Sequence, residues 1–392
     1  MFGELRHNIP KLYLFKVLSS FLLFAPVLVL FFQENGLSMT EIMVLQALYS
    51  IAVILLEIPT GYIADYFTRK KALVSASLFL SAGISIYSFG TDFWSFLAAE
   101  LVWSVGVALF HGTDSAMFYD TLVDLGRTES YKELWGKATS YRLVSAAVAS
   151  ILGGFIAEYG LRFTIIYTVP MIALLIPLTI SLKEPQRHKE VTENHLGEIK
   201  ESLKTAFIHK TDLRFLILYS ALIVTLTKAV YWIYQPYFEA SGLNIAYFGI
   251  VFAGFNIVAA LASQQAHRIE GFLGRKKSLA ALMLLSSAGS LLMGYIIFFY
   301  SFVFALLHQI VRGMREPIIS DYINQIIESK RRSTILSVEH MASNTLYAAV
   351  VPFIGLYTDI YTYSAAMTLL GVTGLIAGTA MLTVFYVARS QN

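Results

Sequence analysis

The stretch Gly61-Tyr62-Ile63-Ala64-Asp65-Tyr66-Phe67-Thr68-Arg69-Lys70 joins two long apolar runs, residues 41–64 and 72–90. It places one acid and two bases in a connection too short to move far from the end of either run. Charges in such a turn can hold the end of one helix against another part of the chain. The same pattern of apolar run, short turn and second apolar run extends along the whole sequence.

The composition agrees with that pattern. Of the 392 residues, 56% are hydrophobic and 14% are charged, whereas about a quarter of the residues in a soluble domain are charged. The chain has no cysteine, which excludes a disulfide scaffold and thiolate metal sites. A membrane-spanning helix needs about 20 apolar residues, so a dozen spans fit within this length. The sequence therefore predicts an all-α membrane protein embedded in a lipid bilayer.

Twelve apolar runs are bounded by charged or turn residues, and we interpret each as a transmembrane helix. Their limits are 12–32, 41–64, 72–90, 93–118, 138–159, 163–182, 215–238, 245–266, 278–297, 299–321, 333–357 and 361–387. Of the Lys and Arg residues, 23 flank the runs on the side of the N-terminus, whereas Arg162 stands alone on the other side. Because cytoplasmic loops are rich in Lys and Arg, we expect both termini in the cytoplasm.

Two segments of the first half recur in the second half at a constant distance. Residues 31–38 (Phe-Phe-Gln-Glu-Asn-Gly-Leu-Ser) match residues 237–244 (Tyr-Phe-Glu-Ala-Ser-Gly-Leu-Asn), and residues 68–73 match residues 274–279. The common offset indicates that a six-helix unit was duplicated. Six is an even number, so both units enter the membrane from the same side, and substrate is expected between them.

The duplication also predicts the domain boundaries. We expect an N-terminal six-helix bundle over residues 1–182, a cytoplasmic linker over 183–213 and a C-terminal six-helix bundle over 214–392. Apolar residues recur at helical spacing within the linker, which could form an amphipathic helix on the membrane surface. A solvated linker is the alternative.

The opening stretch is similar to a signature of the major facilitator superfamily (MFS), which runs Gly-x-x-x-Asp-Arg-x-Gly-Arg-Arg/Lys between helices 2 and 3. The matching positions are Gly61, Asp65, Arg69 and Lys70, and the differing positions are Tyr66 and Thr68. With the predicted topology, the resemblance covers nearly the whole chain. It implies the MFS fold of two six-helix bundles and a secondary active transporter that works by rocker-switch alternating access.

The resemblance further implies a cytoplasmic gate. In similar family members the aspartate at the position of Asp65 caps a helix of the opposite half when the cytoplasmic side closes. Arg69 would then pair with an acid at the end of helix 4, for which Asp120 is best placed. Alternatively, Arg69, Lys70 and Lys71 only determine topology. We favour that alternative for the two lysines and the gate for Asp65, because topology gives no reason for an acid there.

Ten acidic or basic residues fall inside the predicted spans. An unpaired charge at the bilayer centre costs about 2.5–3.5 kcal/mol on insertion scales, so each of these residues needs a partner, water or a function. For those in the cytoplasmic part of their helices we expect structural ion pairs, such as Lys16 with Glu57, or side chains that reach the interface. The candidates for these roles are Lys16, Glu57, Arg142, Arg315 and Glu316.

Two of the ten, Lys228 and Arg312, lie near the middle of helices 7 and 10. Cations at this depth reach water only through a cavity, which predicts a substrate with an anionic or zwitterionic group, or acids awaiting a proton. The aromatic segment that ends helix 7 and a histidine of helix 10 are expected to complete the cavity. These further cavity residues are Tyr231, Trp232, Tyr234, Gln235 and His308.

The remaining acids are candidates for proton coupling. A carboxylic acid in an apolar cavity could exchange a proton as access alternates between the two sides. Glu100 and Asp114 are the first candidates and Glu339 is the third, with His111 one helical turn from Asp114. Static pairing, such as Glu100 with Lys228, is the alternative.

The chain has no phosphate-binding Gly-x-x-x-x-Gly-Lys-Ser/Thr loop, no Gly-x-Gly-x-x-Gly and no His-Glu-x-x-His motif, so we expect no enzyme, cofactor, metal or nucleic-acid partner. The leading interpretation is a monomeric, proton-coupled secondary transporter of the prokaryotic inner membrane. A multidrug/proton antiporter is an alternative, although residues 147–154 lack proline and Val102 replaces an arginine that many such relatives carry. Alternatives of another class are a lipid scramblase or flippase and the permease subunit of an ATP-driven complex.

Overall fold

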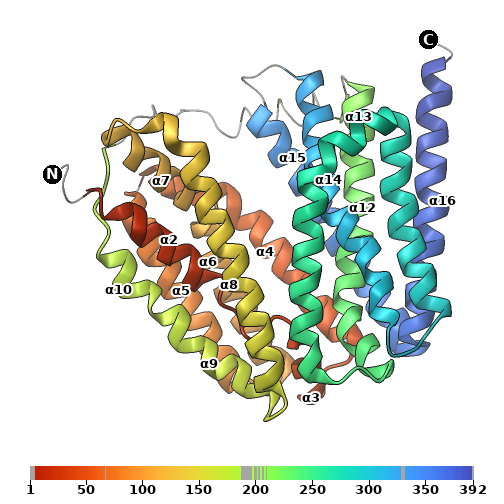
Figure 1. The fold of residues 1–392 in the computed structure, drawn as a ribbon, viewed down its shortest axis with the longest axis horizontal. Helices are drawn as coiled ribbons and strands as arrows, with labels where there is room; N and C mark the ends of the chain where they lie inside the picture. Colours follow the sequence, from red (N-terminus) through yellow and green to blue (C-terminus); the bar gives the residue numbers. More distant parts are fainter. Residues whose placement is uncertain are drawn as a thin grey trace. The chain divides into compact units, whose positions relative to one another are not determined.

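The computed structural model describes residues 5–66, 68–186, 210–327 and 332–390, together with the single positions 197, 201, 204, 207 and 208. The side chains at 57–66, 333 and 388–390 lie outside this description. All regular elements in the described ranges are helices (Figure 1), and eight helical segments are long and apolar enough to cross a membrane. The expected all-α class therefore holds for this part of the chain.

Within each half of the chain, the helices follow one another with short connections. In the first half they are α2 (Asn8–Ser19), α3 (Leu28–Glu34), α4 (Met39–Tyr66), α5 (Arg69–Phe89), α6 (Phe93–Phe110), α7 (Thr113–Asp124), η1 (Thr128–Ser130), α8 (Tyr131–Ala157), α9 (Leu161–Ala173) and α10 (Leu175–Ile180). In the second half they are α12 (Thr211–Ala240), η3 (Ile245–Tyr247), α13 (Phe248–Tyr295), η4 (Ser301–Phe304), α14 (Ala305–Ile326), α15 (Arg332–Ile360) and α16 (Tyr363–Ser390).

The chain forms two compact units. The first unit comprises Met1–Leu37, Ile51–Val191 and Asn244–Ala253, and the second comprises Ser38–Ser50, Thr192–Leu243 and Gly254–Asn392. The start of α4 therefore packs within the second unit, although it precedes the middle of the chain. The start of α13 likewise packs within the first unit.

Three predicted spans are interrupted, which corrects the expectation of continuous helices. The run 12–32 divides into α2 and α3 around Pro26, whose nitrogen cannot donate a helical hydrogen bond. The run 93–118 divides into α6 and α7 at Gly112, where a φ of +78° ends the first helix. The run 163–182 divides into α9 and α10.

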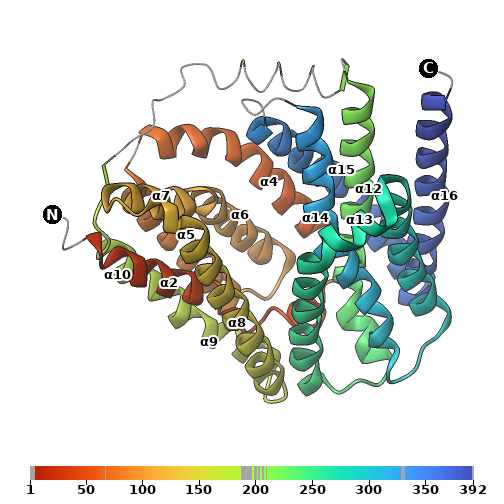
Figure 2. The same ribbon diagram turned by 45° about the horizontal axis from the view of Figure 1, so that its top comes forward.

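Two other predicted spans, 245–266 and 278–297, lie on the two arms of α13, which bends at Gly274 with a φ of +71° (Figures 1 and 2). The eight apolar segments do not include α2, α3, α14 or α15. The first two are short, and the other two carry several charged and polar side chains. The number of spans therefore remains a prediction.

In the first unit, α5 and α6 approach each other closely because their glycines face the partner helix. A Cβ atom added to Gly106 would lie 2.9 Å from the backbone nitrogen of Leu80. A Cβ atom added to Gly83 would lie 3.0 Å from the backbone nitrogen of Trp103. Small residues allow such backbone contact between membrane helices, where packing rather than water exclusion drives association.

In the second unit, α12 packs against α14, α15 and α16, and most of its side chains are buried (Figures 1 and 2). The hydroxyl of Tyr219, deep in this core, donates a hydrogen bond to the carbonyl of Leu279 at 2.9 Å. This arrangement holds α12 firmly and leaves one face of its middle section to meet α14.

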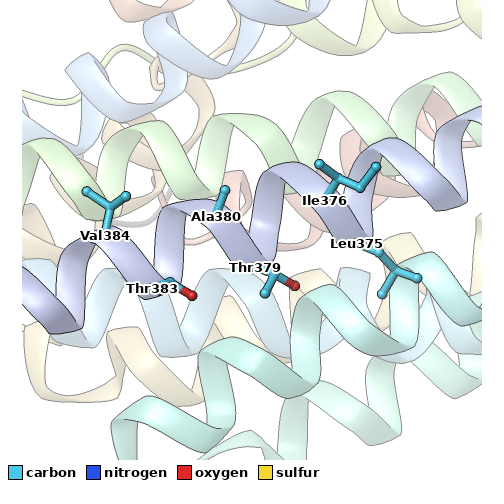
Figure 3. A pocket seen from close by; sticks show the side chains of 6 residues that line it. All are labelled: Leu375, Ile376, Thr379, Ala380, Thr383 and Val384. Atoms are coloured by element: carbon cyan, nitrogen blue, oxygen red, sulfur yellow. The ribbon is translucent and has the colours of Figure 1, made fainter.

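The outer face of α16 is apolar (Figure 3). Six residues of this one helix line a shallow surface hollow: Leu375, Ile376, Thr379, Ala380, Thr383 and Val384. Two threonine hydroxyls are the only polar side-chain groups among them. A binding site needs convergent polar groups from several elements, so this face is better suited to lipid than to a substrate.

Candidate functional site

A pocket of about 240 Å³ lies between α12 and α14 in the second unit. Its polar side chains recur every three or four residues on each helix, so both helices turn one polar stripe towards it. From α12 these are Thr227, Lys228, Tyr231 and Tyr234, and from α14 they are His308, Gln309, Arg312, Arg315 and Glu316. Apolar side chains of Ile223, Val224 and Val311 complete the lining.

The two central cations are held by neutral groups. The Nζ atom of Lys228 donates a hydrogen bond to Oδ1 of Asn344 at 2.7 Å and lies 5.2 Å from the ring centre of Tyr347. The Nη2 atom of Arg312 donates to Oδ1 of Asn256 at 2.8 Å. Both cations are exposed at the pocket, and neither forms a salt bridge with a carboxylate among the described residues. An amide orients a cation without neutralising it, so the positive charge remains available in the pocket.

The third cation of the pocket, Arg315, is neutralised. Its Nη1 atom donates hydrogen bonds to Oε1 of Glu339 at 3.0 Å and to the hydroxyl oxygen of Ser220 at 2.8 Å. The hydroxyls of Ser220 and Ser343 donate to the same carboxylate oxygen at 2.5 and 3.2 Å. Glu339 is only 3% exposed and does not line the pocket. This buried carboxylate on α15 is connected to the pocket through its salt bridge with Arg315.

The opposite end of the pocket is neutral and rigid. The ring of Tyr234 stacks on Phe238 with centroids 5.5 Å apart and planes 6° from parallel. Its hydroxyl accepts a hydrogen bond from Nε2 of Gln309 at 3.3 Å, whereas Oε1 of this glutamine has no hydrogen-bond partner within the described structure. The pocket therefore has a cationic end and an amide end.

Comparison with known proteins assigns the chain to a family. The family model described as Major Facilitator Superfamily matches residues 12–235 and 217–392. The chain belongs to the major facilitator superfamily. A relative of this MFS protein is the uncharacterized MFS-type transporter YxaM of Bacillus subtilis (strain 168), which is 23% identical over 343 residues. The match covers 81% of this chain and 80% of YxaM.

Solved transporter structures share the fold of this MFS protein. The nucleoside transporter NupG has a TM-score of 0.80 and 13% identity, with 96% of this chain and 98% of NupG covered. A bacterial homologue of the human lysosomal transporter Spinster has a TM-score of 0.75 and 14% identity, with 97% of this chain and 95% of the other covered. The MFS protein thus belongs to a family of membrane transporters and shares the fold of these solved structures.

The structure describes the Arg69 side of the predicted cytoplasmic gate. Nε of Arg69 lies 3.5 Å from Oδ2 of Asp120, and both side chains are largely buried. The backbone nitrogens of Arg69 and Lys70 donate hydrogen bonds to Oε1 and Oε2 of Glu184 at 2.8 and 2.7 Å. The sequence analysis missed Glu184, which binds the free N–H groups at the start of α5. Gly61 and Asp65 lie in the part of α4 whose side chains are not described.

The expected pairing of Lys16 with Glu57 stays a prediction. The Nζ atom of Lys16 contacts Oδ2 of Asp114, a partner that was not predicted, and lies 4.5 Å from the ring centre of Trp135. The side chain of Glu57 lies outside the described residues. A lysine beside a carboxylate and over an indole face satisfies its charge within the bundle.

The expected position of His111 one helical turn from Asp114 on a continuous helix is wrong. Gly112 separates α6 from α7, and Asp114 is buried in the first turn of α7 whereas His111 is exposed. Glu100, the other leading proton candidate, is buried in α6. The break at Gly112 therefore places the predicted proton candidates of helix 4 on different helices.

The other predicted residues occupy varied positions. Trp232 is half-buried and Gln235 fully buried, and neither lines the pocket. Arg142 is exposed on α8, and Glu316 is exposed where α14 meets the pocket. Neither of these two charges forms a salt bridge with another described residue, so they do not show the structural pairing that was one expectation for them.

Proposed function

We propose that this MFS protein is a secondary active transporter that moves a small organic anion, or a zwitterion with an anionic group, by rocker-switch alternating access. One observation supports the negative charge of the proposed substrate. Lys228 and Arg312 line one pocket, and their side chains donate hydrogen bonds to Asn344 and Asn256 rather than to carboxylates. An unneutralised charge within a membrane is costly and marks a functional site. An anionic substrate supplies the missing counter-charge.

Proton coupling is the second part of this proposal, and Glu339 is its best-supported carrier. Its carboxylate shares Arg315 with the pocket, so a proton on Glu339 would free that guanidinium to face a bound anion. The charged or titratable groups around it are Arg315 from α14, Lys228 from α12, which interacts with it electrostatically, and His340 from its own helix, whose Nδ1 lies 3.9 Å from Oε2. Asp114 is instead engaged with Lys16, which favours a static role for that acid.

The remaining features are proposed from the charge pattern and the family resemblance. We place both termini in the cytoplasm of a prokaryotic cell, with the protein as a monomer in the inner membrane. The Arg69–Asp120 pair and Glu184 would anchor the loop that presents Asp65 as the gate. Asp65→Asn is then expected to reduce transport without reducing insertion into the membrane.

The test is uptake of radiolabelled organic anions into proteoliposomes, with and without an imposed pH gradient. Lys228→Gln and Arg312→Gln should each lower uptake at least tenfold, because each removes a positive charge that the anion needs. Lys137→Gln is the matched control, since this lysine is exposed and pairs with Glu133 on its own helix. Uptake of lipophilic cations alone, or lipid movement insensitive to the gradient, would reject the proposal.

A further inference from the structure

The amide end of the pocket contains an unused hydrogen-bonding group. Gln309 lines the pocket and is only 2% exposed, yet its Oε1 atom has no partner within the described structure. Buried polar groups in native proteins are nearly always hydrogen-bonded, so an unpaired one calls for an explanation. Tyr234 accepts a hydrogen bond from the other end of the same amide.

Aromatic packing around Tyr234 restrains the amide of Gln309. Tyr234 is stacked on Phe238 and also packs against the ring of Phe255, with centroids 5.6 Å apart. Its hydroxyl oxygen is therefore held in place, and the hydrogen bond from Nε2 restrains the orientation of the glutamine. The terminal torsion of glutamine is soft, so Oε1 can turn a little further towards a donor in the pocket.

The separation of the two ends sets the shape of a ligand. Gln309 and Arg312 are three residues apart on α14, so their side chains leave the helix about 5–6 Å from each other on one face. A volume of about 240 Å³ limits the ligand to one small ring or a short chain. The rings of Tyr231 and Tyr234 border the space between the two ends.

We propose that the pocket selects small organic anions that also carry a hydroxyl or N–H donor about 5–6 Å from the anionic group. The anion binds Lys228 and Arg312, and the donor binds Oε1 of Gln309. This specificity rests on the proposed transport function. A site built to bind a donor discriminates strongly against the analogue that lacks it, because a buried acceptor is then left unpaired.

The test measures binding of matched probes to the purified full-length protein by titration calorimetry. The pairs are 3-hydroxybenzoate with benzoate and 5-hydroxypentanoate with pentanoate, and 3-methoxybenzoate serves as a probe that only accepts hydrogen bonds. We expect each hydroxy acid to bind at least tenfold more tightly than its partner. The methoxy compound should bind no more tightly than benzoate.

Variants of Gln309 and Lys228 test which residue produces the preference for the hydroxy acid. Gln309→Leu should remove the preference for the hydroxy acid, and Gln309→Asn, which keeps an amide but shortens its reach, should reduce it. Lys228→Gln should weaken both members of a pair by the same factor. If the anions bind with dependence on Lys228 but without preference for a donor, the specificity is refuted and the transport proposal stands. If none of these anions binds, the transport proposal itself loses its basis.

Discussion

At the scale of single residues, the cations of the pocket differ in whether a neutral amide or a carboxylate binds them. Asn344 and Asn256 orient Lys228 and Arg312 but leave their charges unneutralised, whereas Glu339 neutralises Arg315. In the proposed mechanism, Arg312 of α14 binds an external anion, whereas Arg315 of the same helix becomes available only when Glu339 no longer neutralises it. We propose that protonation of the Glu339 carboxylate links the two cations, and a substitution tests this directly.

Glu339→Gln should uncouple transport from the pH gradient. The amide keeps a hydrogen-bond acceptor for Arg315 and Ser220 but can neither bind nor release a proton. Gradient-driven accumulation in proteoliposomes should fall at least tenfold, whereas exchange of labelled for unlabelled substrate at equal pH should persist. Glu133→Gln, at an exposed carboxylate, is the control. Accumulation that still follows the gradient in Glu339→Gln would exclude this residue as the proton carrier.

Some of the site could be anticipated from residue types and some could not. Lys228 and Arg312 were predicted to share a cavity because charges at mid-helix are rare in apolar spans, and both lie at one pocket. Gln309, Asn256 and Asn344 carry no charge, so nothing in a single sequence distinguishes them from other polar residues in a helix. Their importance follows only from the directions of their amide groups.

At the scale of elements, glycine determines how closely α5 and α6 pack and where α6 ends. The helical character of the apolar runs was predictable from their length and composition. The interruptions at Gly112 and Pro26 were harder to predict. Glycine and proline are tolerated in many membrane helices, and only the local backbone decides whether they break one. The break at Gly112 separated two residues that helical periodicity alone had placed together.

Gly106→Ala should destabilise the α5–α6 pair by about 1–3 kcal/mol, because the added methyl group overlaps the backbone of Leu80. The control is Gly136→Ala on α8, where an added Cβ atom meets nothing within 4 Å. That change should be neutral or stabilising by up to about 1 kcal/mol, since alanine favours a helix more than glycine does. Thermal unfolding in detergent measures both. A Gly106→Ala variant as stable as the control would show that the interface can adjust.

At the scale of the whole molecule, the distribution of Lys and Arg predicts which connections face the cytoplasm. The chain has no cysteine, so single cysteines can be introduced without removing any native residue of that type. We expect Tyr159→Cys, at an exposed position next to the Arg162 connection, to react with an impermeant thiol reagent in intact cells. Lys132→Cys, also exposed, should react only after the cells are permeabilised. The reverse pattern would invert the proposed topology, and labelling of both from one side would contradict the predicted spans.

A further contact in the second unit concerns the start of α4. Asp359, near the end of α15, accepts hydrogen bonds from the backbone nitrogens of Met39 and Thr40 at 2.9 and 2.7 Å, and from the Thr40 hydroxyl at 2.5 Å. These are the free N–H groups of the first helical turn, where a carboxylate is most stabilising. Close packing of Gly355 against the carbonyl of Met39 brings the two helix ends together.

The donors in this contact are mainly backbone groups, which every residue except proline possesses. Alanine scanning along α4 would therefore leave two of the three bonds in place and suggest that the junction matters little. A change of the acceptor, as in Asp359→Asn, would weaken all three bonds, and a proline at position 40 would remove two of them. Surveys of side-chain substitutions along α4 would thus overlook most of this attachment between the two helices.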